Sequence, residues 1–78
     1  WPKQDLKKSE QLLREGIEAA PERLFTRLYL ADTLDALGRK DEAKKELDAL
    51  LKMKAKPDEA PDEAEYKKRA KTALARLK

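Results

Sequence analysis

The sequence predicts a small all-α domain of about four antiparallel helices, and three observations support this. Ala, Glu, Lys, Leu and Arg dominate the 78 residues, and all five are strong helix formers. Valine is absent and isoleucine occurs once, which argues against β-strands. Glycine and proline are few, and most of them flank segments whose apolar residues recur at helical spacing. A chain of this length forms one domain, 1–78.

The first two predicted helices span about 2–19 and 22–37. The first carries its apolar residues at helical spacing, at Leu6, Leu13, Ile17 and Ala20. It ends before Pro21, because the residue that precedes a proline is pushed out of the α region. The second is the most apolar segment, and its apolar stripe is too wide for one packing partner, so we expect cover on two sides. Gly38 is expected to end it in a left-handed conformation.

The third and fourth predicted helices span 41–54 and about 61–78. The third begins with two acids, which the positive end of the helix dipole favours. Residues 55–61 contain two prolines four apart and form the longest expected loop. Because the connections are short, sequential helices should be antiparallel neighbours. Two i,i+4 ion pairs should support the last helix: Glu63 with Lys67, and Glu65 with Arg69.

The charge pattern argues against several classes of function. The net charge of +3 arises in residues 40–78, and both signs are interspersed along the chain. This predicts a solvated mixed surface, whereas a nucleic-acid binder usually has a basic face with few acids. No segment approaches the roughly 18 apolar residues of a membrane span, so we expect no membrane insertion. Cysteine and histidine are absent, which excludes disulfides and thiolate or imidazole metal sites, and we expect no cofactor.

The first residue carries the only indication of the cellular compartment. The chain begins at Trp1 rather than Met, which is typical of a processed chain, a fragment or an excised domain. Removal of a signal peptide would place the mature protein outside the cytoplasm. The absence of cysteine is compatible with an extracytoplasmic location but does not require it.

Two parts of the chain are related by an offset of 34 residues. Ser9, Leu13 and Ile17 align with Ala43, Leu47 and Leu51. The strings Leu30-Ala31-x2-Leu34, Leu37-Gly38-Arg39-x-Asp41-Glu42-Ala43 and Ala43-x3-Leu47 resemble the tetratricopeptide repeat, whose period is 34 residues. The resemblance implies an α-solenoid fragment: the second helix of one repeat, a full repeat at about 24–57, and a capping helix at about 61–78.

The sequence also departs from the family's pattern. Arg27 occupies the position of an aromatic residue early in the repeat, and Leu34 that of a tyrosine. The closing proline, Pro57, comes two residues late, which suits a capping helix outside the repeat register. Ala31 and Ala43 are expected where paired helices approach closely, because a large side chain there would push the hairpin apart.

The resemblance implies a partner-binding concave face on the first helix of the repeat. The residues expected on this face are Phe25, Leu28, Asp32, Asp35 and Ala36. Its apolar and acidic character favours a partner helix or a basic peptide. The alternative is that the first or the last helix of the chain simply covers Phe25 and Leu28.

These observations predict a non-catalytic protein-interaction or scaffold module that binds a protein or peptide partner. The first alternative is a self-assembling structural subunit that stacks head to tail into an oligomer or filament, with Trp1 and Leu12 as the self-association contacts. A weaker alternative is nucleic-acid or phosphate binding through the basic last helix. We expect no enzyme activity, because no third group converges on the pair Asp32 and Asp35.

Overall fold

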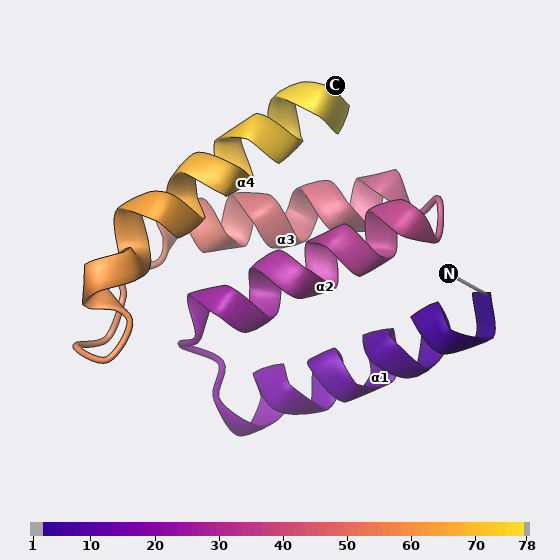
Figure 1. Ribbon diagram of the computed structural model, residues 1–78, viewed down its shortest axis with the longest axis horizontal. Helices are drawn as coiled ribbons and strands as arrows, with labels where there is room; N and C mark the ends of the chain where they lie inside the picture. The colour runs from indigo at the N-terminus through magenta and orange to yellow at the C-terminus, as the bar shows by residue number, and fades with distance from the viewer. Residues whose placement is uncertain (1–2, 78) are drawn as a thin grey trace.

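The computed structural model describes residues 3–77 and contains four α-helices in that range. Successive helices run antiparallel (Figure 1), and a short 3₁₀ turn, η1, precedes the last of them. The predicted all-α class with four sequentially packed helices is confirmed. The elements are α1 (Lys3–Ala19), α2 (Leu24–Ala36), α3 (Lys40–Lys52), η1 (Ala60–Asp62) and α4 (Glu63–Leu77).

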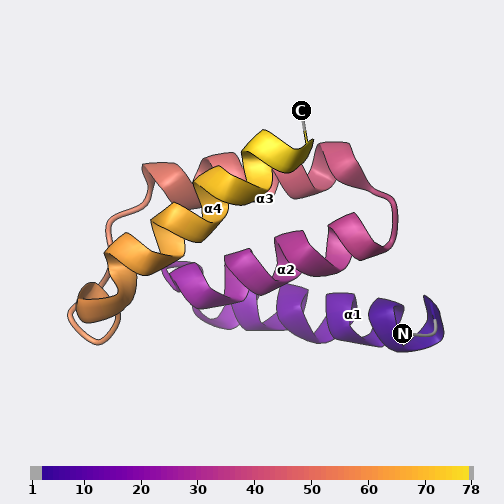
Figure 2. The same cartoon turned by 45° about the horizontal axis from the view of Figure 1, so that its top comes forward.

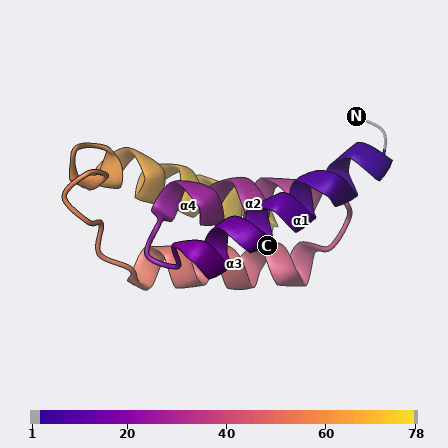
Figure 3. The ribbon, with the colours of Figure 1, turned by 90° about the horizontal axis from the view of Figure 1, so that it is seen from below.

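Helix α2 lies at the centre of the arrangement and packs against all three other helices. Figure 1 shows α1 and α4 on opposite sides of α2, and the rotated views in Figures 2 and 3 show that α3 lies in a second layer, against one side of α2 and α4. Helices α2, α3 and α4 contact one another, whereas the backbone of α1 approaches only that of α2. The domain is therefore a three-helix core with α1 added along one side.

The hydrophobic core lies between α2, α3 and α4. Its buried apolar side chains come from α2 (Leu24, Leu28, Leu30, Ala31, Leu34), α3 (Ala43, Leu47, Leu50) and α4 (Ala70, Ala73, Leu77). Helix α1 contributes only partly buried side chains, Leu13 and Ile17, to the edge of this core. Ala31 and Ala43 are almost inaccessible to solvent, as expected for small residues where paired helices approach closely.

The turn between α2 and α3 depends on Gly38. Its φ of +80° is a left-handed conformation that glycine adopts without a steric penalty. The amide of Gly38 donates to the carbonyl of Asp35 at 2.9 Å, and the amide of Arg39 donates to that of Leu34 at 2.8 Å. These two bonds close a Schellman motif and satisfy carbonyls at the end of α2.

Two predicted helix starts lie two residues too early, and α3 spans Lys40–Lys52 rather than 41–54. Helix α2 begins at Leu24 rather than Glu22, because the amide of Arg23 donates to the carbonyl of Ala20 and closes a turn across Pro21. The last α-helix begins at Glu63, since Pro61 lies in the 3₁₀ turn that precedes it. Within residues 3–77, no helix is long and apolar enough to cross a membrane.

Candidate functional site

A groove of about 670 Å³ runs between α1 and α2. We call it the α1–α2 groove. Helix α1 lines it with Leu6, Ser9, Leu12 and Leu13, and helix α2 with Tyr29, Asp32, Thr33 and Ala36. One of these eight side chains is charged, in a chain whose residues are 45% charged. The groove is therefore far less polar than the rest of the molecule.

Large apolar side chains are exposed in and beside this groove. Leu12 is 68% exposed, Tyr29 44% and Phe25 41%. The rings of Phe25 and Tyr29 lie 4.3 Å apart between centroids, and Tyr66 of α4 lies 6.0 Å from Phe25. Aromatic rings at such distances hold one another in place, so this part of α2 presents a preformed apolar surface.

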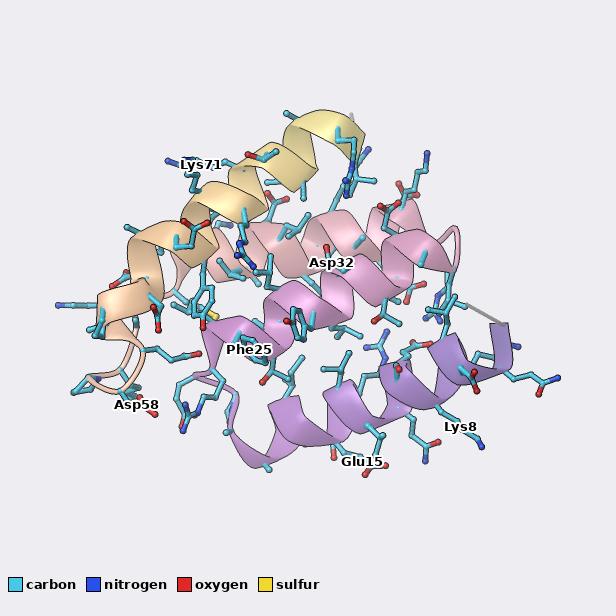
Figure 4. All side chains as sticks on the ribbon, in the orientation of Figure 1. Lys8, Glu15, Phe25, Asp32, Asp58 and Lys71 are labelled. Atoms are coloured by element: carbon cyan, nitrogen blue, oxygen red, sulfur yellow. The ribbon has the colours of Figure 1, made fainter. Side chains whose placement is uncertain are left out.

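Asp32 is the charged residue of the α1–α2 groove, and Figure 4 shows it on the same viewer-facing side of α2 as Phe25. Desolvation by its surroundings raises the pKa of its carboxyl group above the ordinary aspartate value. The positive charges of Arg76 and Arg69 oppose this rise, and the negative charge of Asp35 adds to it. Asp32 is thus an acid that is exposed at the groove and whose charged form its surroundings already disfavour.

The structure does not leave Leu28 and Asp35 free on the predicted concave face. Leu28 is buried at a second groove between α2 and α4, to which Asp32, Arg69 and Arg76 also contribute. Asp35 accepts a hydrogen bond from Arg76 of α4 at 3.3 Å. Helix α4 therefore covers part of the predicted concave face, while Phe25, Asp32 and Ala36 stay accessible on it.

The start of α2 is capped by a residue that sequence reasoning missed. The carboxylate of Glu59, which is 5% exposed, accepts hydrogen bonds from the amides of Leu24 at 2.9 Å and Phe25 at 3.1 Å. These are amides that a helix leaves without partners at its N-terminus, and a negative charge there suits the helix dipole. A residue 35 positions away thus fixes the end of α2 that bears Phe25. Local capping patterns give no signal for it, because they extend over only a few residues.

Four charged side chains link α1 to the start of α3. Glu10 accepts hydrogen bonds from Arg14 at 2.9 Å and from Arg39 at 2.6 Å. The Nε and Nη2 groups of Arg39 also donate hydrogen bonds to the carboxylate of Glu42. Partial burial acts to raise the pKa of Glu10, but hydrogen bonds from the two arginines outweigh it and hold this pKa below the ordinary value. This network positions the outer wall of the groove.

The structure describes one of the two residues predicted for self-association. Leu12 lies in the α1–α2 groove, as given above, whereas Trp1 lies outside the described residues. The predicted pairs Glu63–Lys67 at 2.9 Å and Glu65–Arg69 at 3.2 Å are present on α4. Among residues 3–77, no group of three or more His, Cys, Asp or Glu side chains is placed to hold a metal ion.

Comparison with protein-family models, with curated proteins and with solved structures finds no match to this chain. The geometry of the grooves and the pattern of the sequence are therefore the grounds for assigning a function.

Proposed function

We propose that this chain is a protein-interaction module of tetratricopeptide type, whose α1–α2 groove receives a helix of another protein. The observation that carries the proposal is the apolar lining of this groove on an otherwise highly charged molecule. Exposed apolar surfaces with a polar surround typically mark interaction sites. A groove between two helices suits a third helix, whose apolar side chains at i, i+3, i+4 and i+7 can fill it.

The tetratricopeptide assignment rests on several features that agree. The 34-residue offset, the antiparallel order of the helices and the buried alanines at positions 31 and 43 all belong to that architecture. One departure is that α1 does not pack against α3. We therefore place α1 as an outer helix that packs on α2 alone.

A partner helix explains the groove better than a second copy of this chain. A symmetric dimer through the groove would bring two copies of the same acid, Asp32, into one interface. Like charges in a buried contact are costly. The mass in solution, measured by light scattering after size exclusion over a range of concentrations, tests this choice. We expect a monomer of 9.0 kDa.

The direct test uses a displayed library of randomised amphipathic 18-residue peptides, selected against the whole chain. We expect selected peptides to shift the amide NMR signals of residues that line the α1–α2 groove. Leu12→Gln should weaken their binding about tenfold, because burying an exposed apolar anchor is a typical hot-spot contribution. The matched control is Lys8→Gln, on the side of α1 that faces away from α2 (Figure 4).

Two results would contradict the proposal. One is a selection that yields no binder, or binders that are indifferent to Leu12→Gln. The other is a mass that rises with concentration and falls back to the monomer value in Leu12→Gln. That second result would assign the groove to self-association and support the structural alternative.

A further inference from the structure

We infer that the α1–α2 groove selects a cationic helix, one that carries a lysine or arginine beside its apolar stripe, with Asp32 as the residue that makes the selection. This inference rests on the proposed function and adds the chemistry of the partner. The charges around the groove carry it.

No positive charge meets Asp32 from the side where a partner would lie. The α1 wall of the groove is formed by Leu6, Ser9, Leu12 and Leu13, none of which is charged. On α2 itself, the neighbouring acid is Asp35. In the part of the chain that the structure describes, no side chain forms an ion pair or hydrogen bond with Asp32.

The cations of α4 that lie near Asp32 are already engaged with other acids. Arg69 pairs with Glu65 at 3.2 Å, and Arg76 pairs with Asp35 at 3.3 Å. Both arginine side chains are more than half exposed, so water screens much of their effect. Lys68 also lines the groove between α2 and α4, to which Asp32 itself contributes, but it forms no ion pair with Asp32. Among residues 3–77, Asp32 therefore has no ion-pair partner of its own at the docking surface, and Arg69 and Arg76 act on its charge only from the α4 side.

Covering this carboxylate has a predictable consequence. A fully apolar helix would strand an ionised acid away from water, which is strongly unfavourable unless the acid is paired or protonated. Asp32 is exposed in the free protein, and the desolvation that already raises its pKa would increase under a bound helix. A lysine or arginine on the partner can lay its methylene stem along Tyr29 and bring its charge to the carboxylate. The groove thus penalises neutral and acidic helices more than it attracts cationic ones.

The net charge of the chain indicates which binding rate should carry the preference for a cationic helix. At +3, the molecule as a whole does not attract a cationic peptide over long distances. The preference for a cation must then arise after docking, in the contact with Asp32. It should appear in the dissociation rate, with the association rate little changed.

The test uses the peptides selected in the experiment above, without knowledge of the natural partner. One polar position beside the apolar stripe is occupied in turn by Lys, Gln and Glu, and each peptide is titrated against the whole chain. We expect Lys to bind roughly fivefold more tightly than Gln, and Glu to bind more weakly than both. In Asp32→Asn, Lys and Gln should bind equally. Asp41→Asn, an exposed acid on α3 outside both grooves, is the matched control and should keep the preference.

A pH series adds a second readout. As the pH falls through the raised pKa of Asp32, the preference for Lys over Gln should disappear in the wild-type chain, while Asp32→Asn shows none at any pH. Lys and Gln peptides that bind equally to the wild type, yet still depend on Leu12, would overturn this inference and leave the proposed function standing. An Asp32→Asn variant that keeps the full preference would also overturn it. The absence of any binder would overturn both.

Discussion

Helices α1 and α4 flank α2 on opposite sides, but α4 places three buried side chains in the core, whereas α1 places none there and leaves Leu12 exposed. Helix α4 packs against both α2 and α3, while α1 packs against α2 alone. Partly buried side chains and a surface ion network hold α1 in place. Local stability follows buried apolar contact, so α1 should open more readily than α4. The wall of the groove that can adapt to a partner is thus the α1 wall.

The largest effect that tests this contrast is expected at Ala70 on α4. This residue is fully buried where α4 meets the core, so Ala70→Leu should destabilise the fold by about 1–3 kcal/mol through overpacking. The control is Ala75→Leu, on the exposed side of the same helix, which should change the stability little. Urea denaturation of both variants measures the difference. Equal stabilities would show that α4 is not closely packed on the core.

The next largest effect is expected at the loop before α4. Glu59→Ala removes the buried carboxylate that accepts from the amides of Leu24 and Phe25, and we expect a loss of about 1–2 kcal/mol. Asp58→Ala is the matched control, because its carboxylate pairs with Arg23 at the surface, where an ion pair contributes little. Thermal unfolding distinguishes the two. A Glu59→Ala variant as stable as Asp58→Ala would mean that water replaces the cap without cost.

A smaller and more local effect is expected in the network that holds α1. Hydrogen bonds from Arg39 lower the pKa of Glu42, and those from Arg14 and Arg39 lower that of Glu10 against the effect of burial. A lowered pKa in the folded state means that the network stabilises the fold above the ordinary glutamate value of 4.5. That contribution is lost as the pH falls through the lowered values.

Glu10→Gln removes the acid that links both arginines to α1. We expect hydrogen exchange at neutral pH to become faster in α1 and to stay unchanged in α4, and the stability to depend less steeply on pH below 4.5. Glu15→Gln, on the outer side of α1 in Figure 4, is the control and should leave both unchanged. Uniformly faster exchange in all four helices would mean that α1 and the core unfold together.

Local patterns in the sequence were enough to predict the helices and their order. The turn at Gly38 and the pair Glu63–Lys67 each depend on residues close together in the chain, and both are present as predicted. The start of α2 and of α4 shifted by two residues because turns containing Pro21 and Pro61 take up the positions before them. Such shifts depend on loop geometry, which periodicity does not describe.

The candidate site was predictable only in part. Spacing on one helix face correctly grouped Phe25, Asp32 and Ala36 on an accessible side of α2, but could not show that α4 buries Leu28 and binds Asp35 through Arg76. The α1 wall of the groove was missed, apart from Leu12, because its position depends on how α1 crosses α2. The cap by Glu59 was missed for the same kind of reason. Contacts between distant parts of the chain need the tertiary arrangement.

The smallest expected effect concerns Gly16, in the middle of α1. A glycine inside a helix costs about 0.5–1 kcal/mol relative to alanine, because it loses more backbone freedom on folding. A Cβ atom at this position would lie 3.4 Å from Cγ2 of Thr26, which is ordinary van der Waals contact. We therefore expect Gly16→Ala to raise the thermal midpoint and to slow hydrogen exchange in α1 more than in α4. The difference in hydrogen-exchange rate between α1 and α4 should then become smaller.

Gly38→Ala should have the opposite effect on the stability of the fold. No atom lies near the added Cβ, but the φ of +80° penalises any residue with a side chain, so this variant should lose about 1 kcal/mol. Its loss should affect the α2–α3 hairpin, and therefore all helices, rather than α1 alone. If Gly16→Ala instead protected α1 and α4 equally, α1 would be coupled to the core as firmly as α4 is. The groove would then be rigid on both sides, and a partner helix would have to fit it as it stands.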